Sequence, residues 1–164
     1  MTFPTIAVAN YFIGKAQSEG VSITPMKLLK LVYIAHGWRL GLQNLPLIGE
    51  EIQAWKYGPV VESVYQDFKQ YGRGSIARQK PVFQSNGEMV IPTVTDPVVA
   101  GFLDNVWNAY KHLDGFQLSA ITHQKDTPWY KTWVDNGGSE YLGAAIPQGT
   151  IAEHYRQLAV ERGA

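Results

Sequence analysis

One long apolar segment limits the folds open to this chain more than any other feature. Residues 24–42 have the periodicity of a helix, with apolar side chains around most of its circumference. Thr24 is a suitable N-cap, and Pro25 suits the first helical position because no backbone N–H is needed there. The charged side chains of the segment are Lys27, Lys30 and Arg39. The pattern predicts a helix that reaches about Leu42 and lies in the centre of the fold.

The same kinds of signal predict further helices on both sides of this one. Gly20 is placed to end a preceding helix, and Gly58-Pro59 to begin a following one. Asp96-Pro97 and Thr127-Pro128 repeat the arrangement of an N-cap followed by proline. The expected helices cover about residues 4–18, 25–42, 59–71, 97–113, 117–123, 128–133 and 148–160.

The remaining segments indicate a small amount of β-structure. Residues 50–57 fit a strand or an extended loop, and residues 85–87 fit a turn between short strands at 80–84 and 88–92. We expect this hairpin to pack on the helices, because a two-stranded hairpin alone is marginally stable in water. The predicted class is mainly α (α+β). It is a compact bundle of about six to seven helices around the central apolar helix, with a small β-hairpin, in a single domain over residues 1–164.

Composition restricts the compartment and the class of partner. Charged residues are 17% of the 164 residues and apolar residues 45%, which excludes intrinsic disorder as the main state. No uncharged segment is long enough to span a bilayer, and no secretory signal is expected. The lack of cysteine excludes disulfides and thiolate metal sites. We therefore expect a cytoplasmic protein with no membrane partner.

The charge balance points away from nucleic acid. Basic and acidic side chains number 14 each, which gives a net charge of zero, whereas nucleic-acid-binding proteins usually have a basic excess. We therefore expect no nucleic-acid partner for the chain by itself. The first 80 residues have a net charge of +4 and the remainder −4. If the halves form separate faces, Lys27, Lys30 and Arg39 are candidates for steering an oppositely charged partner.

The histidines suggest neither a metal site nor a strong catalytic motif. The four histidines are scattered, so no metal is expected, and no motif indicates a cofactor. His36 lies in the apolar stripe of the central helix, which predicts a core histidine hydrogen-bonded through one ring nitrogen. Ser119 and His123 share a helix face with Asp126 nearby, a weak pattern that leaves a small hydrolase as an alternative. Otherwise His123 ends a helix, where it interacts favourably with the helix dipole.

The segment at residues 52–61 stands out for its aromatic side chains. Trp55 and Tyr57 alternate onto one face, Gly58 permits a tight turn, and Pro59 favours a helix start. One interpretation is a rigid corner whose aromatic rings pack against the central helix. If the rings are exposed, they mark a contact surface instead.

Three motifs occur in order along the chain. The first is Thr-Pro-Met-Lys-Leu-Leu-Lys-Leu-Val-Tyr-Ile-Ala-His-Gly-Trp over residues 24–38, and the second is Ala-Trp-Lys-Tyr-Gly-Pro-Val-Val over residues 54–61, followed by Tyr65. The third runs from residues 106–107 through 118–123 to Pro128-Trp129. Together they resemble the Panacea domain, a family that includes SocA-like antitoxins and many phage-associated proteins. The departures are small: Leu29 stands where the family often has Gln, and Val32 where it often has Leu.

The resemblance implies a type II antitoxin that neutralises a cognate protein toxin, encoded by the adjacent gene, through direct binding rather than catalysis. One branch of the family instead acts as an adaptor that delivers its toxin to a cytoplasmic protease, which is the alternative function. The motif residues are the candidates for toxin contact: Lys27, Lys30, His36, Trp38, Trp55, Tyr57, Tyr65, His123 and Trp129. Their apolar members are also residue types that fill cores.

Overall fold

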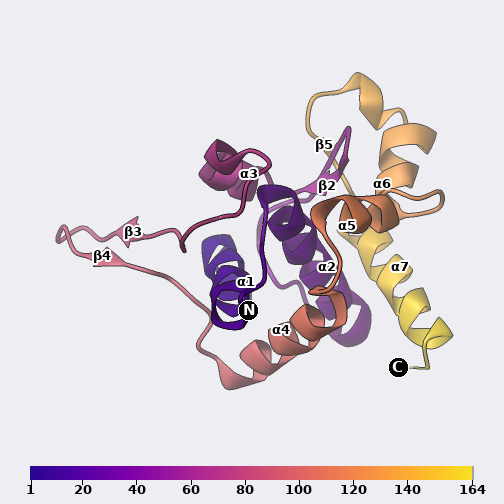
Figure 1. The fold of residues 1–164 in the computed structure, drawn as a ribbon. Helices are drawn as coiled ribbons and strands as arrows, with labels where there is room; N and C mark the ends of the chain where they lie inside the picture. The colour runs from indigo at the N-terminus through magenta and orange to yellow at the C-terminus, as the bar shows by residue number, and fades with distance from the viewer. Residues whose placement is uncertain (164) are drawn as a thin grey trace.

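The computed structural model describes residues 1–163 (Figure 1). In chain order its elements are α1 (Thr5–Glu19), α2 (Pro25–Gln43), β1 (Gln53–Trp55), β2 (Gly58–Val60), α3 (Glu62–Phe68), η1 (Lys69–Tyr71), β3 (Val82–Phe83), β4 (Met89–Val90), α4 (Pro97–Tyr110), α5 (Gly115–Thr122), α6 (Pro128–Tyr130), η2 (Lys131–Asp135), η3 (Gly138–Glu140), β5 (Ala144–Ala145) and α7 (Gln148–Glu161). Helices predominate, and the predicted mainly α class with a small β-hairpin is confirmed. Within residues 1–163, no helix is both long and apolar enough to cross a membrane.

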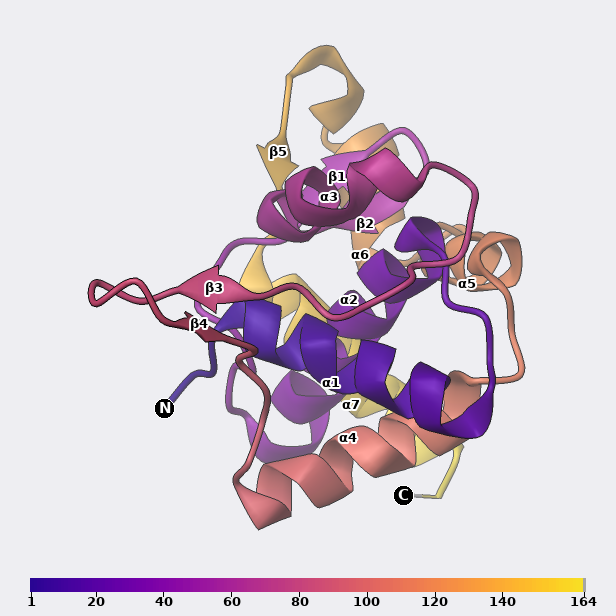
Figure 2. The same cartoon turned by 60° about the vertical axis from the view of Figure 1, so that its left-hand side comes forward.

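The helix α2 occupies the centre of the fold, as its sequence pattern predicted. It begins at Pro25, and the Thr24 hydroxyl accepts a hydrogen bond from the Lys27 amide at 3.3 Å. Every residue from 27 to 40 is buried. The helices α1, α4, α5 and α7 all pack against it (Figure 2). A helix covered on several sides has to be apolar around most of its circumference.

The helix α7 packs closely against α2, and this contact depends on two glycines. A Cβ atom added at Gly37 would lie 2.2 Å from the Tyr155 ring, and one added at Gly41 would lie 2.7 Å from the Arg156 backbone nitrogen. Neither distance leaves room for a side chain. The Tyr155 ring packs edge-on against Trp38, with 5.2 Å between ring centroids. The chain's last helix is therefore an integral part of the core.

Residues 52–61 form a hairpin, so the prediction that Gly58-Pro59 begins a helix is wrong. The strands β1 and β2 are antiparallel, with Ala54 opposite Pro59, and β5 pairs with the other side of β1. Gly58 has a φ of 118°, which is incompatible with a helix. Pro59 lies in an edge strand, where a residue without an N–H is tolerated. The helix α3 begins only at Glu62.

The predicted second hairpin is present as β3 and β4, but it does not pack on the helices. Both figures show it projecting from the body of the fold (Figures 1 and 2), and Phe83 and Met89 at its tip are exposed. The buried Asn10 side chain holds its base, because it donates to the carbonyls of Lys80 and Pro92, each at 2.9 Å. The expectation that the hairpin packs on the helices is therefore wrong beyond its base. The base itself is anchored through the polar contacts of Asn10.

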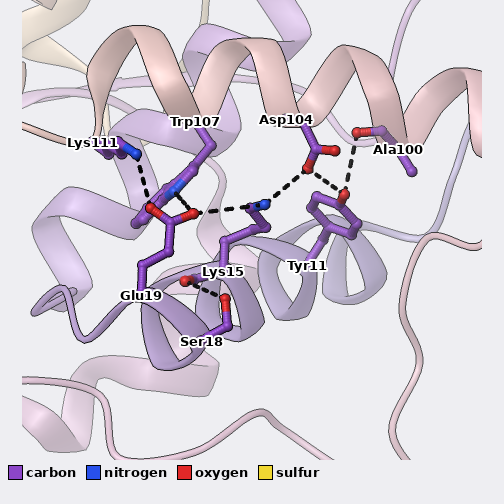
Figure 3. Close-up of polar contacts among 8 residues, drawn as sticks. All are labelled: Tyr11, Lys15, Ser18, Glu19, Ala100, Asp104, Trp107 and Lys111. Carbon is purple, nitrogen blue, oxygen red and sulfur yellow. Dashed lines mark hydrogen bonds and ion pairs between the residues drawn. The ribbon is translucent and has the colours of Figure 1, made fainter.

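A polar cluster joins α1 to α4 (Figure 3). The Glu19 carboxylate accepts from the Trp107 indole N–H at 3.1 Å and pairs with Lys111 at 2.9 Å. These two hydrogen bonds hold the pKa of the Glu19 carboxyl below its usual value. Nearer the start of α1, the Tyr11 hydroxyl donates to Asp104 at 2.5 Å. The two helices are thus tied together outside the apolar core.

The connection from α4 to α5 differs from the prediction. Asp114-Gly115 was expected to end α4, but α4 ends at Tyr110 and Asp114 caps the start of α5. The Asp114 carboxylate accepts from the Gln117 amide at 2.8 Å, and the Gln117 side chain accepts from the Asp114 amide at 2.9 Å. This reciprocal capping box is a stronger signal for a helix start than for a helix stop.

Candidate functional site

Two adjoining pockets form a groove where the N-terminal end of α2 meets the β1–β2 hairpin, the end of α3 and the start of α5. Their volumes are about 680 and 440 Å³, and Met26, Tyr57 and Gly72 line both. We call this surface the aromatic groove. Its side chains come from distant parts of the sequence: Met26, Lys30, Trp55, Lys56, Tyr57, Tyr65, Lys69, Arg73, Asp114, Phe116 and His123.

The walls of the aromatic groove are aromatic and largely open to solvent. Trp55 and Tyr65 pack edge to face, with 5.0 Å between their ring centroids. Tyr57 is 62% exposed and Phe116 is 71% exposed. Of the two interpretations of residues 52–61, the exposed ring of Tyr57 favours the contact surface. The strand β2 contacts the central helix, whereas the Trp55 ring packs on Tyr65. Large exposed rings gathered in one groove indicate a contact surface.

The floor of the aromatic groove contains a buried amine. Lys30 is 2% exposed, and its Nζ donates to the Pro59 carbonyl at 3.1 Å. A Cβ atom added at Gly58 would lie 2.9 Å from that Nζ, and the φ of 118° at this position favours glycine, so the hairpin passes closely over the amine. Burial lowers the pKa of Lys30 to about 7, because it disfavours the charged form.

The rim of the aromatic groove is basic. Lys56, Lys69 and Arg73 are exposed there, and none of them forms an ion pair within residues 1–163. The acidic side chain on the rim is Asp114, whose carboxylate is engaged at the start of α5. The groove therefore presents unpaired positive charge around apolar walls.

Ser119 and His123 lie at the edge of the aromatic groove, but their contacts do not form a catalytic triad. The Ser119 hydroxyl donates to the Tyr57 carbonyl at 2.7 Å. Its oxygen also lies 3.4 Å from His123 Nδ1, which contacts the Ser119 carbonyl oxygen. Within residues 1–163, no hydrogen bond or ion pair joins Asp126 to His123. A triad needs an acid that orients the base as well as a base that contacts the nucleophile. The Ser119 hydroxyl instead holds the hairpin against α5, and the His123 ring packs edge-on against Trp129.

The structure brings together five of the nine predicted contact residues. Those that line the aromatic groove are Lys30, Trp55, Tyr57, Tyr65 and His123. Trp129 lies behind the groove, where it is buried and its indole N–H donates to the Trp55 carbonyl at 2.5 Å. Trp38 is also buried, and its indole N–H donates to the Tyr110 hydroxyl at 2.9 Å. These two tryptophans support the fold and are not at the groove surface.

Lys27, Lys30 and Arg39 are buried, so the prediction that they steer a partner from the surface is wrong. The Lys27 amine donates to the Lys111 carbonyl at 2.6 Å. The Arg39 guanidinium donates to the carbonyls of Met1 and Pro46 at 3.3 and 3.0 Å. Lys27 and Arg39 donate to backbone carbonyls because α2 is covered on the faces that carry them.

Several groove residues were absent from the sequence-based prediction. Met26, Phe116, Lys69 and Arg73 line it, but a single exposed ring or cation carries no signal in the sequence. Phe116 lies within the capping box of α5, two positions after Asp114, and only the contact of α5 with α2 and β2 brings it to the groove. Within residues 1–163, no group of three or more metal-binding side chains occurs.

His36 is a core hydrogen-bond acceptor, as its place in the apolar stripe predicted, and it does not line the aromatic groove. Its Nδ1 accepts from the backbone N–H groups of Leu47 and Ile48 at 3.2 and 3.4 Å. Two donors facing one nitrogen require the neutral ring. Burial lowers the pKa of His36 to about 4.

Acid should therefore destabilise the fold through His36. Between pH 6.5 and 4 the unfolded chain binds a proton at this residue and the folded chain does not, so the free energy of unfolding should fall by about 3 kcal/mol. Urea denaturation at neutral pH and near pH 4.5 measures the loss. A His36→Gln variant keeps an acceptor but does not titrate in this range, so it should lose less stability on acidification. An equal loss in both proteins would assign the effect to other groups.

The chain is similar to one protein family and to a named antitoxin. The model of the family "Antitoxin SocA-like, Panacea domain" matches residues 28–130, which is more than half of the chain. The chain is also 29% identical over 152 residues to Antitoxin SocA of Caulobacter vibrioides strain NA1000 / CB15N, with 92% of this chain and 81% of that protein aligned. Among solved structures none matches the chain. On the extent of the family match, the chain belongs to the SocA-like antitoxin, Panacea domain family.

Proposed function

We propose that this chain is an antitoxin that neutralises a cognate protein toxin by direct binding, and that the aromatic groove is its contact surface. The observation that carries the proposal is the similarity to Antitoxin SocA, which extends over 92% of this chain. We further propose that the adjacent gene encodes the toxin. The chain acts in the cytoplasm as a single domain and neutralises the toxin without a catalytic step.

The chemistry of the aromatic groove supports a protein partner. Exposed aromatic rings, Met and Arg are the side chains enriched at the cores of protein interfaces, and truncating one of them often weakens binding strongly. Tyr57 and Phe116 line the same pocket as Met26 and are both more than half exposed. A partner that covers them removes apolar surface from water, which is the main favourable term in association.

Direct binding predicts that the toxin is inactivated at a fixed ratio. The product of the adjacent gene would be purified and held well above its dissociation constant while the full chain is added and toxin activity is followed. We expect a linear fall that reaches zero near a whole-number ratio. Complete, time-dependent loss of activity at a small fraction of one equivalent would show turnover and contradict the proposal. Neutralisation in cells but not with purified components would favour the proteolytic adaptor.

Groove variants with matched controls locate the contact surface in the same assay. Phe116→Ala should weaken toxin binding by about 10-fold or more, whereas Phe83→Ala should not, although both rings are 71% exposed. Tyr57→Ala and Tyr141→Ala form a second pair, with rings 62% and 67% exposed. If the control variants lose as much affinity as the groove variants, the contact surface lies elsewhere.

A further inference from the structure

The aromatic groove has a strongly one-sided charge. Four cationic side chains line it, three on the rim and Lys30 on the floor, and none pairs with a carboxylate within residues 1–163. The single acidic side chain, Asp114, already accepts a hydrogen bond from the first turn of α5. The charge of the groove is thus complementary to an anionic group, and its walls are complementary to an apolar one.

Lys30 has hydrogen-bonding capacity that the fold does not use. An ammonium group has three donors, and the hydrogen bond that the structure gives this amine is the one to Pro59. Buried cations are normally paired, because removing a charge from water without a partner is unfavourable. Lys30 lines the same part of the groove as the paired rings of Trp55 and Tyr65. A carboxylate that enters the groove beside those rings reaches the floor.

We propose that the aromatic groove binds an acidic segment of the partner protein, in which a carboxylate pairs with Lys30 while a neighbouring apolar side chain packs on Tyr57 and Phe116. This inference rests on the proposed function for the identity of the partner as the toxin. It adds the chemistry by which the partner is recognised. Lys56, Lys69 and Arg73 on the rim favour further acidic groups on either side of the inserted carboxylate.

The inserted carboxylate provides specificity as well as affinity. In the free protein the amine lies under Gly58 with a lowered pKa, so part of the population is neutral near pH 7. A carboxylate beside the amine favours its charged form and pairs with it away from water, where the attraction is stronger than at the surface. A segment with an amide in place of the carboxylate leaves the ammonium unpaired, so the groove discriminates between the two.

A pair of small probes that differ only in charge tests the inference without the toxin. The probes are 3-phenylpropionate and 3-phenylpropionamide, which share the aromatic ring and the chain length. Each would be titrated to about 10 mM into the full chain, because ligands of this size bind in the millimolar range. Backbone amide shifts of Lys30, Gly58 and Tyr57 report on the groove. We expect the carboxylate to bind at least about 5-fold more tightly than the amide.

Two variants identify the group responsible for the preference. Lys30→Met keeps the length of the side chain and removes the amine, so the two probes should then bind about equally. Lys125→Met removes an exposed lysine outside the groove and should keep the preference. Thermal melts establish that both variants are folded. If Lys30→Met fails to fold, a Lys69→Met variant, which should reduce the preference in part, replaces it.

The outcomes separate this inference from the proposed function. Equal binding of the two probes, or no groove shifts with the carboxylate, overturns the inference even if the purified toxin is neutralised at a fixed ratio. A preference for the carboxylate that disappears in Lys30→Met supports it even if the adjacent gene product is not a toxin. A preference that survives in Lys30→Met contradicts the role of Lys30.

Discussion

Between pH 7 and 10 the free energy of unfolding of this protein should rise by about 3–4 kcal/mol, and most of that rise should be absent from Lys30→Met. The reason is the burial of Lys30, which lowers its pKa to about 7 in the folded chain. In the unfolded chain the amine keeps its ordinary pKa of about 10.4. Over this interval the unfolded chain therefore binds one more proton than the folded chain.

The sign follows from proton linkage. Stability rises with pH wherever the unfolded state binds more protons, so alkali should stabilise the fold until the unfolded lysine also loses its proton. Above pH 10 the buried hydroxyl of Tyr33 reverses the trend. Burial raises its pKa well above the ordinary value, so the unfolded chain loses that proton first and stability falls. The wild-type protein should thus be most stable near about pH 9 to 10.

Urea denaturation curves at several pH values between 6 and 10 measure this dependence. Lys125→Met is the matched control, because it removes an exposed lysine that makes no ion pair within residues 1–163. The control should keep the wild-type slope. At pH 7 Lys30→Met should also be at least as stable as the wild type, since burying methionine does not require removing a charged group from water. A wild-type slope in Lys30→Met would show that the buried amine is not the titrating group.

Trp107→Ala should lower the free energy of unfolding by about 3–5 kcal/mol, which is the usual range for a buried tryptophan. Trp107 is 0% exposed and lies against Phe12 of α1, with 6.5 Å between ring centroids. Its indole N–H also donates to Glu19 (Figure 3). Truncation to Ala removes the packing, leaves a cavity between α1 and α4, and deprives the carboxylate of one donor.

Two further variants separate these contributions in thermal and chemical denaturation. Glu19→Gln keeps the volume of the side chain and weakens the polar cluster, and it should destabilise the fold much less than Trp107→Ala because solvent screens the exposed carboxylate. Trp55→Ala is the control for truncating a tryptophan that is not fully buried, because Trp55 is only half-buried in the groove wall. It should lower the free energy of unfolding clearly less than Trp107→Ala does. Equal losses for the two tryptophans would contradict the burial that distinguishes them.

The candidate site was predictable from the sequence only in part. Trp55, Tyr57 and Tyr65 belong to one short segment, and their aromatic character marked it before its conformation was known. Phe116 and Met26 complete the same groove from α5 and α2. Their positions depend on how those helices pack, and residues far apart in the sequence leave no local pattern. The prediction also placed Lys27 among the surface candidates, although packing of α4 against α2 covers it.

What the sequence determined by itself is the set of helices, because their signals are local. Thr24-Pro25, Asp96-Pro97 and Thr127-Pro128 each begin a helix where capping and proline geometry predict one. Tertiary structure decided the rest. Gly58-Pro59 carries a helix-start signal, yet pairing with β1 makes it a strand, because interstrand hydrogen bonds and contact with α2 outweigh a local preference. In the same way, the burial of Lys30 and the exposure of the β3–β4 hairpin depend on which segments pack together. The hydrophobic pattern within one segment does not specify its packing partners.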